Sequence, residues 1–182
     1  MKKNYFIVAG ILAIMIAISV AIILFTKKEE STIKSTDDIL KMLNEIYKGL
    51  DLPSLENQVI DVTDKETVKY FTGITSDIET LVVSEPLMNA QAYSLIVVKA
   101  KDSGNIEKIK QEIYDNIDMS KWICVSADKL YITNSGNIIF AVMSSEDMAK
   151  PVYEKFKEYV NNKVGKELEK SNASGIDSFI TE

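Results

Sequence analysis

The chain has 182 residues, with 27 acidic side chains against 21 basic ones and a net charge of −6. Every basic residue is a lysine, histidine and arginine are absent, and Cys124 is the single cysteine. These absences exclude nucleophilic sites that need histidine, zinc sites that contain it, internal disulfides and thiolate metal clusters. The acidic balance also argues against nucleic acid as a partner.

Residues 5–26 form an uncharged run that predicts a transmembrane helix. A helix of this length spans about 33 Å, close to the hydrocarbon thickness of about 30 Å. Lys2 and Lys3 precede the run, as they would in a secretory signal, but the run is too long and lacks a small-residue cleavage site. No cysteine follows it for lipidation. We therefore expect residues 1–28 to be an uncleaved signal anchor.

The charges that flank the apolar run predict the orientation of the chain. Lys2, Lys3 and the terminal amine favour a cytoplasmic amino terminus. Residues 29–182 contain 17 lysines and 27 acidic residues, a net charge of −10, and a long domain of this kind translocates readily. The sequence thus predicts a single-pass protein of the cell membrane, with its carboxy-terminal domain outside the cytoplasm.

After a polar tether at 29–35, helical patterns open the predicted domain, which covers residues 36–170. The residues Ser35 to Asp38 resemble a capping box, and the apolar positions that follow lie on one helical face: Ile39, Met42, Leu43, Ile46 and Leu50. A second capping box from Thr63 to Glu66 predicts a short helix that ends before Gly73. Both patterns predict helices that pack on a core.

Strand patterns and two further helices follow. The runs 80–84 and 93–98 are rich in β-branched residues, and 121–127 is also consistent with a strand. Leu130 to Val142 predicts a hairpin that turns at Asn134-Ser135-Gly136-Asn137. The two helices carry apolar stripes, the first at Ile106, Ile109, Ile113 and Ile117, the second at Met148, Val152, Phe156, Val160 and Val164. Residues 171–182 show no pattern and predict a mobile tail.

The predicted order is therefore α-α-β-β-α-β-β-α. It indicates an α+β domain in which a small antiparallel sheet carries its helices on one face. A chain of this length needs no disulfide to build a core.

Three features of the sequence are candidate sites. Pro86, Leu87 and Met88 lie in a predicted connection and form a possible partner-contact patch, unless Leu87 and Met88 tuck under the sheet. Cys124 stands in the apolar run Trp122-Ile123-Cys124-Val125, which predicts a small buried side chain rather than a reactive thiol. Three acidic groups could supply carboxylates for glycoside cleavage or for calcium: Asp37-Asp38, Glu85 with Asp77 and Glu79, and Glu146-Asp147. Two of the three lie at helix starts, where capping explains them better than catalysis or calcium binding. We therefore expect no catalytic residues, no metal and no cofactor.

Several segments together are similar to a known family. Ser84-Glu85-Pro86-Leu87-Met88, the run from Tyr93 to Lys101 before the Ile106 helix, and Gly136-Asn137 before an apolar strand resemble domain of unknown function 4358. The resemblance covers about residues 36–165. It implies a small extracytoplasmic domain of a Gram-positive bacterium, held by a lipoprotein signal or a membrane helix. Because the family has no established activity, it implies no functional residues.

The sequence thus predicts a membrane-anchored, extracytoplasmic and non-catalytic interaction module of the cell envelope or of a sporulation compartment. The lipid bilayer is the expected partner of the anchor, and a protein of the envelope is the possible partner of the domain. Two alternatives stay open. The first is a protein that binds or senses a small solute or glycan in a cleft between sheet and helices. The second is a cell-wall enzyme that uses carboxylates.

Overall fold

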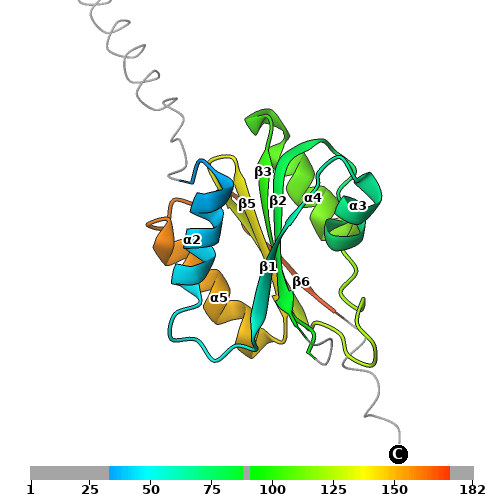
Figure 1. The fold of residues 1–182 in the computed structure, drawn as a ribbon, viewed down its shortest axis with the longest axis vertical. Coiled ribbons are helices and arrows are strands. Elements are labelled where there is room, and N and C mark those ends of the chain that lie inside the picture. The colour runs from blue at the N-terminus through cyan, green and yellow to red at the C-terminus, as the bar shows by residue number, and fades with distance from the viewer. Residues whose placement is uncertain (1–32, 88–90, 173–182) are drawn as a thin grey trace, which may run out of the picture. The chain divides into compact units, whose positions relative to one another are not determined.

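An antiparallel sheet with the strand order β1-β2-β3-β5-β4-β6 runs through the centre of the domain (Figure 1). The structure is a computed structural model that describes residues 33–87 and 91–172. The described elements are α2 (Thr36–Ile46), β1 (Leu55–Ile60), α3 (Lys65–Thr72), β2 (Ile78–Pro86), β3 (Ser94–Ala100), the 3-10 turn η1 (Ser103–Asn105), α4 (Ile106–Asn116), β4 (Lys129–Ser135), β5 (Ile138–Ser144), α5 (Glu146–Tyr159) and β6 (Leu168–Ser171). This confirms an α+β domain with an antiparallel sheet.

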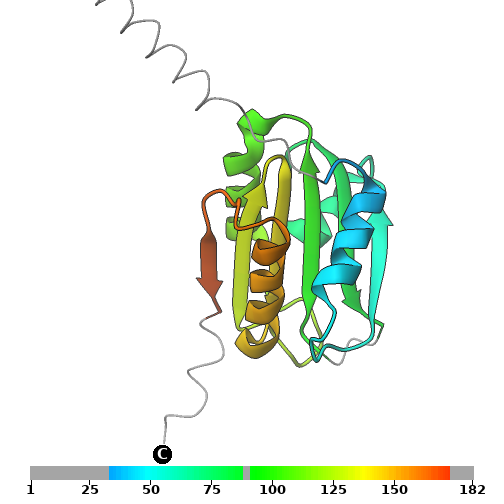
Figure 2. The ribbon, with the colours of Figure 1, turned by 90° about the vertical axis from the view of Figure 1, so that its left-hand side faces the viewer.

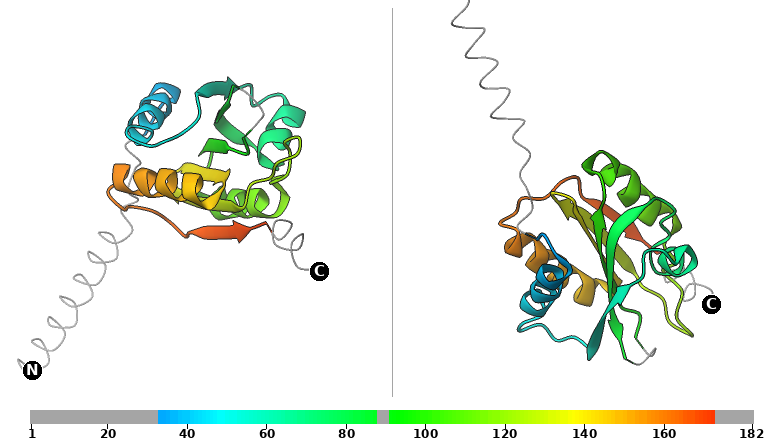
Figure 3. Two further views of the ribbon diagram at one scale, coloured as in Figure 1. Left: turned by 90° about the horizontal axis from the view of Figure 1, so that it is seen from below. Right: turned by 45° about the horizontal axis from the view of Figure 1, so that its top comes forward.

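Helices cover both faces of the sheet, so the prediction that they pack on one face was wrong. Helices α2 and α5 lie side by side on one face, and α3 and α4 lie on the other (Figures 2 and 3). The reason lies in the central strands. All seven residues of β5 and six of the seven residues of β3 are buried. Successive side chains of a strand point to opposite faces, so such unbroken burial requires cover on both sides.

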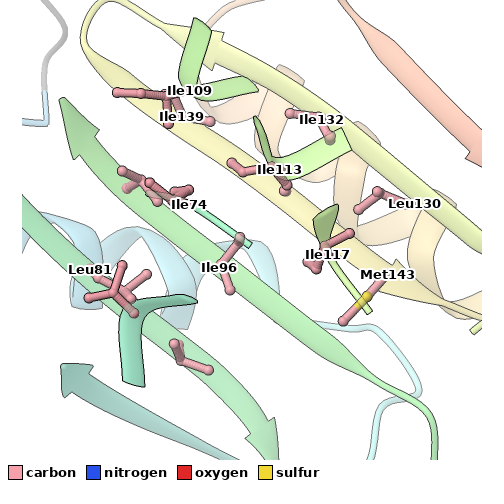
Figure 4. Close-up of a cluster of buried hydrophobic side chains, with 14 of the residues drawn as sticks. Ile74, Leu81, Ile96, Ile109, Ile113, Ile117, Leu130, Ile132, Ile139 and Met143 are labelled. Carbon is pink, nitrogen blue, oxygen red and sulfur yellow. The ribbon is translucent and has the colours of Figure 1, made fainter. Parts of the chain in front are cut away.

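The α3–α4 face carries an aliphatic core. The isoleucine stripe of α4 packs on alternate residues of β3, β4 and β5, and Ile109 and Ile113 are fully buried, as predicted (Figure 4). The opposite core is more aromatic. There Phe140 of β5 stacks on Phe156 of α5 with ring centroids 4.2 Å apart, and α2 contributes its predicted apolar stripe.

At the helix ends, the predicted capping box at Ser35 and the predicted stop at Gly73 are confirmed, and the second predicted capping box was wrong. Ser35 Oγ accepts the backbone N–H of Asp38 at 3.2 Å, and Asp38 Oδ2 accepts the backbone N–H of Ser35 at 3.0 Å, which confirms the first capping box. The second helix is capped by Asp64, not by Thr63. Gly73 ends this helix at φ 73°, and a Cβ there would lie 2.6 Å from the backbone of Asn116.

Four further details of the predicted element order were wrong. The edge strands β1 and β6 were not predicted, so the observed order is α-β-α-β-β-α-β-β-α-β. Residues 121–127 form an irregular loop, not a strand. Pro86, predicted in a connection, belongs to β2. The last helix ends at Tyr159 because Asn161 and Asn162 adopt left-handed backbone angles, φ 55° and 57°, which end the helical path before Val164.

The described domain extends slightly beyond residues 36–170. Ile33 is only 1% exposed and packs in the α2–α5 core, and β6 includes Ser171. The predicted membrane segment, with residues 1–28, and the tail from 173 lie outside the described residues. Within the described ranges, no helix has the length and apolar character needed to cross a membrane.

The buried stripe of α4 yields a stability prediction. Replacing Ile113 by alanine removes a fully buried side chain from the α3–α4 core, so the free energy of unfolding should fall by about 2–5 kcal/mol. Denaturant unfolding of the full chain in detergent measures this change in the free energy of unfolding. Gln111→Ala on the exposed side of the same helix is the control and should change the value by no more than about 0.5 kcal/mol. A cost for Ile113→Ala as small as the control's would contradict the packing.

Glu112 ties α4 to the segment before β2 and gives a second prediction. Its carboxylate accepts the backbone N–H groups of Thr75 at 2.9 Å and Ser76 at 3.0 Å, and the Ser76 hydroxyl at 2.7 Å. Burial alone raises the pKa of Glu112, but these hydrogen bonds outweigh it and hold the pKa below its usual value. A lowered folded pKa stabilises the fold above the unfolded pKa of about 4.3, and the contribution disappears as the pH falls through the folded value.

We therefore expect Glu112→Gln to lower the free energy of unfolding by about 1–3 kcal/mol at neutral pH. The gap between wild type and variant should close as the pH falls below about 4, where unfolded glutamate is protonated. Denaturant titrations at a series of pH values measure this gap in the free energy of unfolding. Glu45→Gln, in an exposed pair with Lys48, should show little gap at any pH. A Glu112→Gln gap that does not depend on pH would contradict this role.

Candidate functional site

Three consecutive apolar side chains project from the loop between α4 and β4. Ile123 is 80% exposed, Val125 is 36% exposed, and Cys124 between them is exposed as well. We call these three residues the apolar tip. The prediction that Cys124 is buried was therefore wrong. The run pairs with no strand of the sheet, and Cys124 adopts a left-handed φ of 64°, which turns the chain where a strand would continue.

The loop beneath the tip is anchored in the core. Trp122 is 9% exposed, and it packs in the α3–α4 core together with Met119 and Ala127. The backbone N–H of Ala127 donates to the carbonyl of Met119 at 2.8 Å and closes the base of the loop. Ile123 therefore projects from a loop whose base is held in the core.

Lys121 strengthens this base from inside. Its side chain is 4% exposed, and Nζ lies 2.5 Å from Glu85 Oε1 and 3.2 Å from Ser94 Oγ. The ammonium also lies 5.2 Å from the ring centroid of Phe71 and 5.4 Å from that of Trp122. Burial lowers the pKa of Lys121, while the carboxylate of Glu85 opposes the shift. The lysine therefore links the loop to β2, β3 and α3.

The predicted patch lies at the same end of the sheet. Leu87, directly after β2, is 67% exposed, so it does not tuck under the sheet. Pro86 pairs with Leu55 at the end of β2 and is half-buried, and Met88 lies outside the described residues. On α3, Tyr70 is 61% exposed, and its ring centroid lies 5.7 Å from Lys121 Nζ. The structure thus brings Leu87, Tyr70 and the apolar tip to one end of the domain.

The acidic residues considered for catalysis do not converge. Glu85 binds Lys121, whereas Glu79 binds Lys99 at 2.7 Å toward the other end of β2, and Asp77 binds Lys65 at 2.8 Å. Among the described residues, no group of three or more potential ligands is placed to hold a metal ion. Asp38 caps a helix, as predicted. The apolar tip is therefore the candidate site that this end of the domain presents.

Sequence reasoning missed Ile123 and Val125 because their run has the composition of a buried strand. A usable signal lies in its flanks. Asp118 and Ser120 precede the run, and Ser126 and Asp128 follow it, all of them residues that favour turns. Asp118 Oδ1 does accept the backbone N–H of Ser120 at 2.8 Å. A short apolar run between two turn-forming pairs is typical of a loop tip as well as of a strand.

Comparisons of the chain with protein-family models, with curated proteins and with solved structures found no match in any of the three.

Proposed function

We propose that this chain is a membrane-anchored extracytoplasmic protein that binds a protein partner through the apolar tip and performs no catalysis. The exposure of three consecutive apolar side chains on a rigid base carries the proposal. When a partner covers an isoleucine that is four-fifths exposed, the free energy falls by about 25 cal/mol per Å² of apolar surface buried. Because the base is already ordered, little entropy is lost on binding.

The charges around the tip favour a protein over a lipid surface. Asp118 and Asp128 flank the loop and are exposed, and residues 29–182 carry a net charge of −10. Anionic lipid headgroups repel such a surface. A protein pocket that is apolar inside and basic at its rim matches both the tip and its flanks.

Location is supported by the sequence. The uncharged run at 5–26 and the lysines before it favour an anchored chain with an external domain. Within the domain, the chain enters at the end of the sheet away from the tip: Lys99 Nζ, at the far end of β3 from Ser94, donates to the carbonyl of Lys34 at 2.8 Å. Lys34 and the apolar tip therefore lie toward opposite ends of β3.

The single cysteine offers a direct test of the tip. A photoactivatable crosslinker attached to Cys124 of the full chain, in membranes of the cells that naturally carry it, should form a defined adduct with one protein. Ile123→Asp should abolish the adduct without lowering the melting temperature, because Ile123 is exposed. Immunoblots of the illuminated membranes give the first measurement and thermal melts the second.

A matched control places the same label elsewhere. In the double variant Cys124→Ser, Lys101→Cys, the crosslinker stands on an exposed residue at the other end of β3 and should give no such adduct. The proposed contact would be contradicted if both positions gave equal adducts or if the adduct survived Ile123→Asp. Crosslinking to lipid alone would contradict it as well.

The proposed topology has its own test. The full chain should stay in the membrane fraction in high salt and at alkaline pH, with its original amino terminus intact, because an uncharged span of 22 residues holds it. Protease added to intact cells should remove the domain while cytoplasmic proteins survive. A mature amino terminus near Lys27, or a domain protected from protease, would contradict this topology.

A further inference from the structure

A concave surface lies between α5 and the edge strand β6, and none of its lining residues belongs to the apolar tip. Figure 2 shows β6 at the edge of the sheet, beyond β4 and on the side where α5 lies. A cleft of about 460 Å³ opens there, and we call it the α5–β6 cleft. Its volume falls in the range of small-molecule sites, about 300–1,000 Å³.

The cleft is built by strand register and helical spacing. In the pairing of β4 with β6, Tyr131 stands opposite Glu169, so the two residues are neighbours on one face, and Glu167 precedes Glu169 on that same face. Helix α5 contributes Glu146, Lys150, Tyr153 and Glu154, which share one helical face. Two tyrosines form the floor: the rings of Tyr131 and Tyr153 stack with centroids 5.2 Å apart.

One polar group of the floor has no protein partner among the residues that the structure describes. Tyr131 is only 7% exposed, and no hydrogen bond of its hydroxyl is found among the described residues. The neighbouring Tyr153 differs, because its hydroxyl donates to Glu167 Oε2 at 2.8 Å. The Tyr131 hydroxyl is not one of the fully buried polar atoms, so it is open to the cleft. It can therefore accept a hydrogen bond from a ligand that enters there.

The charges around this hydroxyl favour a cation. Four glutamates line the cleft, with Lys150 as the single lining lysine. Lys157 bridges Glu154 and Glu167 at 3.3 and 3.2 Å, and Lys129 holds Glu169 at 2.6 Å. Burial, followed by the charges of Glu169 and Glu146, raises the pKa of Tyr131. Lys150 also lies 3.9 Å from Glu146, so the four carboxylates face three lysines and one negative charge remains in excess. The neutral hydroxyl offers a lone pair to a donor beside this excess charge.

Two other ligand classes fit less well. A sugar ring stacks on the open face of an aromatic side chain, but Tyr131 and Tyr153 are 7% and 3% exposed, so their faces are covered. A metal ion needs converging oxygens, and no suitable group of ligands occurs among the described residues. A primary ammonium on an alkyl chain needs only what the cleft offers, namely carboxylates at its sides and one hydroxyl acceptor on its floor.

We infer that the α5–β6 cleft binds a primary ammonium group, carried by a small diamine or by a lysine side chain of a peptide, with Tyr131 and Glu169 as its principal contacts. This binding is separate from the contact proposed for the apolar tip.

Calorimetric titration of the full chain in detergent micelles, at neutral pH and moderate salt, tests the inference. The probes are 1,5-diaminopentane, N-acetyl-lysine amide, 1,5-pentanediol and a disaccharide of N-acetylglucosamine. We expect at least one amine to bind and the diol and the sugar not to bind. Stronger binding of the free diamine assigns the site to small molecules, and stronger binding of the lysine amide assigns it to peptides.

Conservative variants locate the binding. Tyr131→Phe removes one oxygen atom, and Glu169→Gln removes one charge, and each should weaken amine binding at least about fivefold. Tyr159→Phe on α5 and Glu45→Gln on α2 lie outside the lining residues and should leave affinity unchanged. The inference is overturned if neither amine binds, if the diol or sugar binds as well as the amines, or if all four variants behave alike.

Discussion

Burial of the central strands β3 and β5 on both faces is the constraint on which the rest of the domain depends. The two strands pair over six residues each. The side chains of β5 alternate between two cores: Ile139 faces the aliphatic core of α4, and Phe140 faces the aromatic core of α5. Each core needs its own helices to exclude water. With both faces covered, the surfaces left for binding are the ends of the sheet and its edges, where the apolar tip and the α5–β6 cleft lie.

The edge that forms the cleft depends on a buried lysine. Lys110 of α4 is fully buried, and Nζ donates to Asn134 Oδ1 and to the carbonyl of Lys166, both at 2.8 Å, while Glu107 lies 2.7 Å away. A buried ammonium is tolerated only with such partners. Gly165 lies so close that a Cβ would collide with Asn134 Oδ1. These contacts hold the chain before β6 against β4 and so fix Glu167 and Glu169 beside Tyr131.

The parts of this fold that the sequence predicts are those encoded by neighbouring residues. The capping box at Ser35, the isoleucine stripe of α4 and the turn at Gly136 all appear where local patterns place them. The helices on the second face of the sheet were not predicted, although the unbroken apolar run of β5 indicates that both faces are covered. Strands β1 and β6 were missed because Glu56, Gln58 and Lys170 give no strand pattern, and these short segments become strands only by pairing at the edges.

The candidate sites were harder to predict for the same reason. The tip at Ile123 has the composition of a core strand, and only the tertiary structure shows that no strand of the sheet pairs with it. The cleft joins Tyr131 to Glu169, which are distant in sequence and meet through a pairing that no local pattern indicates. Leu87 was identified from its place in a connection, which is local information, and its exposure agrees with that position.

The segment formed by β6 and Asn172 contacts both the cleft and the loop that carries the apolar tip. The backbone N–H of Asn172, directly after β6, donates to the carbonyl of Asp128 at 2.9 Å, and its side chain donates to Ser120 Oγ at 3.3 Å. Strand β6 thus forms a wall of the cleft, and the residue after it holds both ends of the loop that carries the tip. Displacing β6 would release both surfaces together. Changes at Ile123 or at the Tyr131 hydroxyl act on one surface alone, because neither group takes part in that fastening.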